Sequence, residues 1–314
     1  MVFTWKAGGS SFCRHSKAVN KRRSLINRLW NSSPRSLTEA ILRRLKRERP
    51  AAGLVLDWVK VQGGPLAGAE LLLAPAISPT WREMAEGTFD SYFIEPLETG
   101  GNLAGQTVWD VGAHFGYHTL CFAQLVGENG RVFAFEPNPA NLLRLRQNLE
   151  RNAELAKRVV VVPKAAAAQD GHTTLVFSDE LENGESSCSY VDGALLPRVP
   201  ERYLQFQRET VPTVTLDGFL ASGCSAPPSV VKIDVEGAEW LVLQAARRVL
   251  STHAPTLLIE VHNIRLMFEV QRLLASSGYE LELVGQDHAT SSRCFVLAQG
   301  AGGSPGGQTG GAKG

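Results

Sequence analysis

The segment from Thr107 to Pro137 constrains the fold of this chain more than any other. It reads T-V-W-D-V-G-A-H-F-G-Y-H-T-L, continues as an amphipathic run and ends as R-V-F-A-F-E-P. The pattern predicts a strand, a tight turn that Gly112 and Gly116 permit, a helix and a second strand. Glu136 follows Asp110 by 26 positions, a spacing that brings it to the tip of the neighbouring strand. A carboxylate there can accept both hydrogens of a ribose diol, so we predict a nucleoside-binding site at the edge of a parallel sheet.

The turn lacks the features of phosphate-binding loops. A dinucleotide site uses G-x-G-x-x-G and a P-loop uses G-x-x-x-x-G-K-[ST], and neither pattern is present. Asp110 precedes the first glycine, where its charge would repel phosphate and suit a ligand with an ammonium and a sulfonium group. S-adenosylmethionine is such a ligand, and it is the cofactor we predict; the alternative is a turn whose glycines serve packing only. The predicted cofactor-binding residues are Asp110, Gly112, Ala113, His114, Gly116, Tyr117, Glu136, Pro137 and Asn138.

Acidic residues gather in a second segment, Val230 to Trp240, which reads V-V-K-I-D-V-E-G-A-E-W. A buried-type strand breaks here into a helix, so Asp234, Glu236 and Glu239 are expected at the carboxyl edge of the sheet, where open parallel sheets bind ligands. The alternative for both glutamates is favourable interaction with a helix N-terminus. The carboxylates could also hold a hard cation through oxygen ligands, but no ligand spacing demands one and we assign no metal.

The strand expected from Thr256 to His262 reads T-L-L-I-E-V-H and ends with Glu260 and His262. An imidazole at a strand tip can take a proton from an acceptor hydroxyl at neutral pH. A single histidine is, however, more often structural, so the two interpretations of His262 stay open.

Composition fits a soluble enzyme. The chain has 314 residues, 44% of them hydrophobic and 20% charged, enough to bury a sizeable core. No apolar run approaches the ~18 residues of a membrane span, and the N-terminus has no stretch of signal-peptide type. The five cysteines are scattered and form no C-x-x-C pair, which favours neither a disulfide framework nor a zinc site. We therefore expect a cytoplasmic protein.

Charge is distributed unevenly along the chain. Residues 1–50 contain 13 Lys and Arg against two acidic residues, while the rest of the chain is net acidic. The apolar spacing predicts short helices at residues 24–30 and 36–48. The functional interpretation of this basic arm is attachment to an anionic surface, such as a membrane, nucleic acid or an acidic partner. The alternative is a solvated and partly disordered extension.

Four blocks together carry a family resemblance: D-V-G-A-H-F-G-Y, A-F-E-P-N, K-I-D-V-E-G-A-E and I-E-V-H. In this order they resemble the FkbM family of S-adenosylmethionine-dependent methyltransferases, over roughly residues 85 to 285. The resemblance implies an α/β fold with a doubly wound, mostly parallel seven-stranded sheet of the class I methyltransferase, Rossmann-like type. It implies methyl transfer to a hydroxyl oxygen of a sugar, glycan or secondary metabolite.

The resemblance also implies residue roles. Asp110, Gly112 and Gly116 would hold the methionine part of the cofactor, Glu136 its ribose, and Asp234 would border the reacting centre. One departure is His114, where the family often has asparagine; both side chains can hydrogen-bond.

The expected chemistry is attack of an acceptor oxygen on the methyl group, which needs a positioned base. We rank Asp234 first, as base or acceptor anchor, and His262 second. Glu236, Glu239 and Lys232 are weaker candidates for contacts with the acceptor hydroxyl. Two other functions stay open: a nucleic-acid methyltransferase that uses the basic arm, disfavoured by the acidic K-I-D-V-E segment, and a non-catalytic S-adenosylmethionine-binding module.

These patterns divide the chain into four regions. We expect a basic arm over residues 1–50, a cap over 51–100 with a hairpin within 53–75, a methyltransferase domain over 101–299 and a disordered Gly-rich tail over 300–314. Residues 178–208 show no clear periodicity and are expected to form an acceptor wall, with Tyr190, Tyr203 and Phe206 available to stack on a sugar ring.

Overall fold

The computed structural model describes residues 56–76, 78–100, 102–178, 189–191, 194, 206–284 and 294–300. Contacts divide the chain into two units, Met1–Gly53 and Leu54–Gly314, and every described residue belongs to the second. The two helices predicted in the basic arm, the predicted tail beyond residue 300 and Tyr203 therefore lie outside the described residues.

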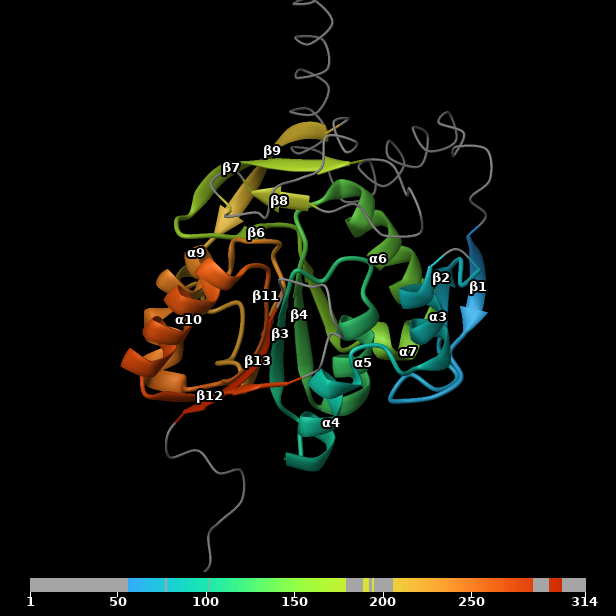
Figure 1. Ribbon diagram of the computed structural model, residues 1–314. Coiled ribbons are helices and arrows are strands. Elements are labelled where there is room, and N and C mark those ends of the chain that lie inside the picture. Colours follow the sequence, from blue (N-terminus) through green and yellow to red (C-terminus); the bar gives the residue numbers. More distant parts are fainter. Residues whose placement is uncertain are drawn as a thin grey trace, which may run out of the picture. The chain divides into compact units, whose positions relative to one another are not determined.

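A seven-stranded sheet forms the centre of the second unit (Figure 1). Its strands are β3 (Thr107–Val111), β4 (Arg131–Phe135), β5 (Val159–Val162), β10 (Val230–Ile233), β11 (Thr256–Val261), β12 (Tyr279–Leu283) and β13 (Cys294–Gly300). They are ordered β12-β13-β11-β10-β3-β4-β5, and only β13 runs antiparallel to its neighbours. The order reverses between β3 and β10, which confirms the predicted doubly wound sheet of class I type.

Helices cover both faces of this sheet, as Figure 1 shows. On one face lie α5 (Tyr117–Val126), α6 (Pro139–Arg151) and the short α7 (Ala153–Ala156); on the other lie α8 (Leu216–Ala221), α9 (Glu239–Gln244), the π-helical turn η3 (Val249–His253) and α10 (Ile264–Ser276). α6 begins with a cap and a proline: the Asn138 side chain accepts a hydrogen bond from the Ala140 amide at 2.9 Å, and Pro139 occupies the first turn. Among the described residues, no helix is long and apolar enough to cross a membrane.

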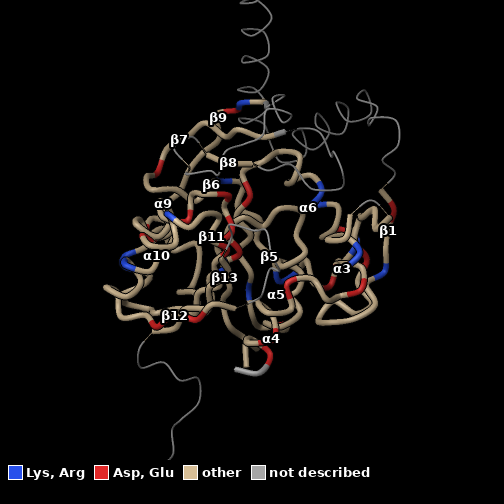
Figure 2. The backbone as a smooth tube through the Cα atoms, viewed as in Figure 1, with Lys and Arg blue, Asp and Glu red and all other residues tan. Residues whose placement is uncertain are grey.

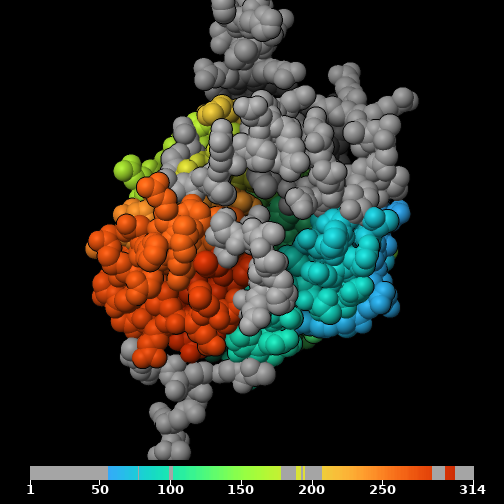
Figure 3. All heavy atoms as spheres, viewed as in Figure 1, coloured from blue at the N-terminus to red at the C-terminus, as the bar shows by residue number. Residues whose placement is uncertain are grey.

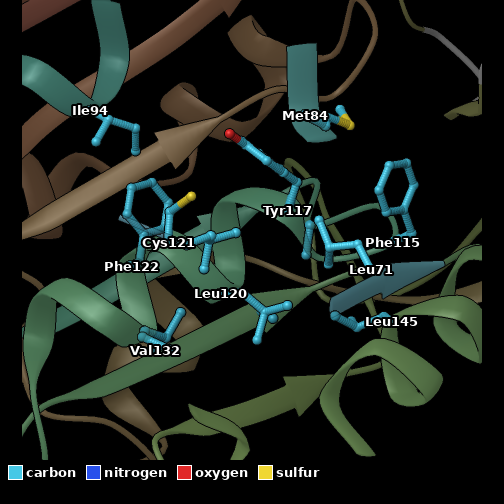
Figure 4. Close-up of a cluster of buried hydrophobic side chains, with 14 of the residues drawn as sticks. Leu71, Met84, Ile94, Phe115, Tyr117, Leu120, Cys121, Phe122, Val132 and Leu145 are labelled. Atoms are coloured by element: carbon cyan, nitrogen blue, oxygen red, sulfur yellow. The ribbon is translucent and has the colours of Figure 1, made fainter. Parts of the chain in front are cut away.

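Side chains alternate across the central strands and build two cores. Val108 and Val132 point into the core beneath α5, whereas Trp109 and Phe135 point into the core beneath α8 to α10. Figure 4 shows the first core, where Leu120, Cys121 and Phe122 of α5 lie near Val132 of β4 and Leu145 of α6. Each fully buried side chain of this size stabilises the fold by ~1.5–3 kcal/mol.

The cap contains β1 (Asp57–Lys60), β2 (Glu70–Leu73), α3 (Pro79–Glu86) and α4 (Ser91–Gly100). β1 and β2 pair as an antiparallel hairpin, which confirms the predicted one. The Asn148 side chain of α6 accepts from the Leu72 amide at 2.9 Å and donates to the Phe115 carbonyl at 2.8 Å. One buried amide thus ties the cap to the glycine turn. Figure 3 shows the cap, blue to cyan, and the C-terminal strands and helices, orange to red, on two sides of one face.

A second, four-stranded sheet was not anticipated. It contains β6 (Ala165–Ala166), β7 (Gly171–Ser178), β8 (Ser189–Val191) and β9 (Phe206–Val214), in the order β6-β9-β7-β8. β8 and the start of β9 lie within residues 178–208, where the sequence shows no clear periodicity. β8 is three residues long and is positioned by its pairing with β7, so no local pattern reveals it. In Figure 1 this sheet lies above the ends of β3 and β4.

Candidate functional site

A cavity of about 290 Å³ opens at the carboxyl ends of β3, β4 and β10. Its wall combines the glycine turn after β3, the tips of β4 and β10, α3 and the loop after it, and residues of β6, β7 and β8. Small-molecule sites in proteins commonly measure ~300–1,000 Å³. The carboxyl edge beside the switch in strand order is also where ligands bind in open α/β sheets.

Two glycines shape the turn after β3 for different reasons. Gly112 has φ +84°, and a Cβ on it would lie 1.7 Å from the carbonyl oxygen of Asp234. Only glycine therefore allows the ends of β3 and β10 to meet. Gly116 has φ +95°, and a Cβ there would lie 2.5 Å from Cδ1 of Leu145. Gly112 lies on the cavity wall, whereas Gly116 packs against α6 behind it.

Glu136 lies at the tip of β4, on the cavity wall and 3% exposed. Its Oε2 accepts from the His114 amide and its Oε1 from the Asn138 amide, both at 2.8 Å. Burial raises the pKa of Glu136 to about 7, although the two amide hydrogen bonds oppose this shift. The carboxylate is therefore fixed in orientation and close to its ionisation point at neutral pH.

The other predicted cofactor residues divide into two groups. Ala113, His114, Tyr117 and Pro137 line the cavity beside Glu136. Asn138 does not line it; this residue is fully buried and its side chain caps α6. Burial lowers the pKa of His114 to about 3, so its ring is neutral, and its Nε2 is buried without a hydrogen-bond partner.

Asp110 lies beneath the glycine turn and not on the cavity wall, because strand alternation points it toward α5. Its Oδ2 accepts from Thr119 Oγ1 at 2.5 Å, and its Oδ1 lies 3.4 Å from Lys232 Nζ. Lys232 is the residue paired with Asp110 on the neighbouring β10, and its Nζ also donates to the Gly112 carbonyl at 2.8 Å. Lys232 lines the cavity and Asp110 does not, so the predicted direct contact of Asp110 with the cofactor stays a prediction.

Lys232 joins the glycine turn to the acidic cluster. Its Nζ lies 3.3 Å from Asp234 Oδ2, and the lysine side chain is 2% exposed. Burial by itself would lower the pKa of Lys232, but Asp234 and Asp110 raise it above its ordinary value. Lys232 therefore carries a positive charge throughout the neutral pH range, which is what these two carboxylates require.

His262 lies at the centre of the acidic cluster. Its Nδ1 is 2.8 Å from Glu239 Oε1, and its Nε2 is 3.3 Å from Glu236 Oε2, 3.4 Å from Glu260 Oε1 and 3.7 Å from Asp234 Oδ1. Asp234, Glu236 and Glu260 line the cavity, while Glu239 and His262 are buried behind them. Figure 2 shows acidic positions gathered beside β11.

The surroundings of this cluster shift the pKa of both residues that were predicted as bases. Burial would lower the pKa of His262, but the Glu239 hydrogen bond and the nearby carboxylates raise it to about 10. Burial would raise the pKa of Asp234, but Lys232 and His262 lower it to about 2. In this arrangement His262 already carries a proton at neutral pH, so it is no free base, and Asp234 is an ionised acceptor of hydrogen bonds.

Several residues of the cavity wall were not predicted from the sequence. Trp81 and Met84 of α3 and the following Phe89 and Asp90 come from the cap. Asp90 has φ +49°, and its carboxylate lies 3.3 Å from Nε2 of His118. No motif marks the segment T-F-D-S, and its approach to the glycine turn depends on tertiary packing.

The acceptor wall predicted within residues 178–208 is represented by β8. Alternation along this strand places Ser189 and Val191 on the cavity wall, while Tyr190 between them is not a wall residue. The aromatic stacking predicted for Tyr190 therefore does not match its position.

Comparison with known proteins gives a consistent family match. The profile of the methyltransferase FkbM domain matches residues 110–281, more than half of the chain. Hexuronic acid methyltransferase AglP from Haloferax volcanii is 28% identical over 176 residues, which are 56% of this chain and 64% of that protein. A protein-L-isoaspartate O-methyltransferase from Triticum aestivum is 31% identical over 104 residues, 32% of this chain and 41% of that protein. The chain thus spans less than two-thirds of either relative.

Among solved structures, methyltransferase FkbM from Methylobacillus flagellatus KT is similar at 22% identity and a TM-score of 0.42. The similarity covers 61% of this chain and 43% of that one.

Proposed function

The chain belongs to the methyltransferase FkbM family, and we propose that it transfers a methyl group from S-adenosylmethionine to a hydroxyl oxygen of a sugar, glycan or secondary metabolite. One observation carries this proposal: Glu136, suited to a ribose, and Asp234, suited to an acceptor hydroxyl, line the same cavity at the tips of β4 and β10, on either side of β3. The name of the relative from Haloferax volcanii, a hexuronic acid methyltransferase, favours a sugar as acceptor.

The residues present fit the cofactor of this family, S-adenosylmethionine. Glu136 offers a buried carboxylate to the ribose hydroxyls, and the turn at Gly112 leaves its backbone open to the methionine part. His114 adds a buried ring nitrogen on the wall without a partner of its own. Buried polar atoms of this kind normally have a hydrogen-bond partner, so a ligand that supplies one is favoured.

S-adenosylmethionine supplies a methyl group bonded to a positively charged sulfur. Asp234 accepts a hydrogen bond from the acceptor hydroxyl and so orients its oxygen toward the cofactor side of the cavity. Lys232 holds Asp234 ionised and fixes it beside the Gly112 carbonyl. Correct orientation of two bound reactants lowers the activation barrier of such a reaction by up to ~7–11 kcal/mol, so a rigid anchor for the acceptor speeds the reaction.

Glu136→Gln is expected to weaken binding of S-adenosylmethionine about tenfold or more. The amide replaces one acceptor oxygen by a donor, and a hydrogen bond to a charged group contributes ~1.5–3 kcal/mol. Isothermal calorimetry measures the change, with the exposed Glu128→Gln as the matched control. Unchanged affinity in Glu136→Gln would show that Glu136 does not bind the ribose. Binding of NAD by the wild-type chain would contradict the choice of cofactor.

Affinity for S-adenosylmethionine is expected to rise as the pH rises through about 7. Glu136 has a pKa raised to about 7 by burial, and the charged group that acts on it is Lys232. Ribose hydroxyls donate to the ionised carboxylate, so binding favours that form and releases a proton near neutral pH. Calorimetry in buffers of different ionisation enthalpy measures this release. A release that persists unchanged in Glu136→Gln would assign the proton to another group.

The acceptor class is tested with isotopically methyl-labelled cofactor. Mass spectrometry would follow label transfer to a uronic-acid glycan, a neutral sugar and a nucleic acid, of which we expect a sugar to be labelled. The acidic wall of Asp234, Glu236 and Glu260 repels a polyanion, which disfavours the nucleic acid. Transfer to nucleic acid alone would favour the alternative in which the basic arm over residues 1–50 binds the substrate. Binding of an anionic surface by that arm stays a prediction.

A further inference from the structure

Three side chains in the acidic cluster are placed as the ligands of a metal ion. Asp234, Glu236 and His262 each offer one atom, and these atoms all lie within 4.8 Å of one another. We propose that Asp234, Glu236 and His262 bind one divalent metal ion at the wall of the cavity. This inference does not depend on the proposed methyl transfer.

The distances within the cluster suit a shared ion. The Nε2 atom of His262 lies 3.3 Å from Glu236 Oε2 and 3.7 Å from Asp234 Oδ1. Two ligand atoms that each lie ~2.0–2.2 Å from one ion, at tetrahedral or octahedral angles, are about 2.8–3.6 Å apart. The ligand atoms of Asp234 and Glu236 lie within 4.8 Å of each other, and these two side chains are 27% and 29% exposed, so they have room to close around an ion.

A second observation comes from the ring of His262 itself. His262 is 2% exposed, and its Nε2 is fully buried and makes no hydrogen bond, although it points into the carboxylate cluster. The other ring nitrogen, Nδ1, pairs with the fully buried Glu239 at 2.8 Å. Metal-binding histidines usually pair their second nitrogen with a carboxylate in this way, which fixes the tautomer and directs the first nitrogen at the metal. A divalent ion bound here would displace the proton that the carboxylates otherwise hold on His262.

The two carboxylate oxygens of Asp234 face different partners, which supports the same metal site. Its Oδ2 faces Lys232 at 3.3 Å, and its Oδ1 faces His262. One oxygen therefore balances the lysine while the other remains directed at the cluster. Glu236 and Glu260 add further negative charge within 3.4 Å of His262 Nε2, so the cluster attracts a cation.

The ligand types indicate the class of metal. One imidazole nitrogen with two carboxylate oxygens suits a first-row divalent ion such as Mn²⁺. Because Asp234 and Glu236 lie on the cavity wall, the remaining coordination positions would face the cavity. Water, or an oxygen of a bound molecule, would fill them.

The test uses the full chain, stripped with a chelator and titrated with Mn²⁺, with free Mn²⁺ followed by electron paramagnetic resonance. We expect one tight site per chain. Glu236→Gln and His262→Gln are expected to weaken it more than tenfold, and Glu239→Gln by ~10–100-fold, the usual effect of losing the carboxylate behind a histidine ligand. The matched control is Glu282→Gln, an exposed glutamate of β12, with unchanged affinity.

Equal affinity of the wild-type chain and Glu236→Gln, or the lack of a stoichiometric site in the wild type, would overturn the proposal. If His262→Gln fails to fold by circular dichroism, Glu236→Gln carries the test, because its side chain is 29% exposed. The titration contains neither cofactor nor acceptor. A chain that binds Mn²⁺ but transfers no methyl group would disprove the proposed function and keep the metal site, and the reverse result would do the opposite.

Discussion

Asp234→Asn is expected to lower turnover by ~10²-fold or more while the fold and the affinity for S-adenosylmethionine are kept. Asp234 lines the cavity as an ionised carboxylate, and asparagine removes the charge that holds and orients an acceptor hydroxyl. Its backbone carbonyl, which packs against Gly112, is unchanged by the substitution. Initial rates with labelled cofactor measure turnover, and calorimetry checks that the cofactor still binds.

His262→Ala provides the contrast to Asp234→Asn. His262 lies behind the wall and contacts carboxylates, so its loss should act through the position of Asp234 and Glu236. Full turnover in Asp234→Asn together with lost turnover in His262→Ala would reverse the ranking of the two residues.

Lys232→Met is expected to lower the free energy of unfolding by about 3–5 kcal/mol. The substitution leaves Asp110, which is fully buried, without the cation that offsets its charge, and a buried unpaired charge is costly. Urea denaturation measures the loss. The control Lys157→Met removes an exposed ion pair with Glu154 and should leave the free energy of unfolding nearly unchanged.

A double variant separates charge from packing at Lys232. Asp110→Asn combined with Lys232→Met removes both partners, so it should be more stable than Lys232→Met alone. If Lys232→Met is as stable as the wild-type chain, Lys232 does not hold the ends of β3 and β10 together.

The local parts of the fold were predictable from the sequence. The predicted succession of strand, turn, helix and strand between Thr107 and Pro137 is present as β3, the glycine turn, α5 and β4. Each of these elements is marked by its own glycines, caps or apolar periodicity. Glu136 and Asp234 were predictable for the same reason, because a strand tip is set by where the strand ends.

Side-chain direction and long-range pairing were not predictable to the same degree. Asp110 and Asn138 belong to the predicted motif, but their side chains point away from the cavity, toward α5 and α6 respectively. Their direction depends on which face of the strand or turn each residue occupies. The contact of Lys232 with Asp110 depends on the register of β10 against β3, which brings together residues more than a hundred positions apart.

The second sheet also depends on long-range pairing that could not be predicted from the sequence. Its strand β8 contributes Ser189 and Val191 to the cavity wall, yet it is three residues long and gains its stability from pairing with β7. Cap residues such as Trp81 reach the wall because Asn148 ties the hairpin to α6 and the glycine turn. Neither arrangement leaves a periodic signal in the sequence.

The central claim is that cofactor and acceptor meet between Glu136 and Asp234. A crystal structure of the chain with S-adenosylhomocysteine, the demethylated product, tests it most directly. We expect both ribose hydroxyls to donate to Glu136 and the sulfur to face Asp234 across the cavity. A product bound elsewhere, or bound with its ribose away from Glu136, would contradict it.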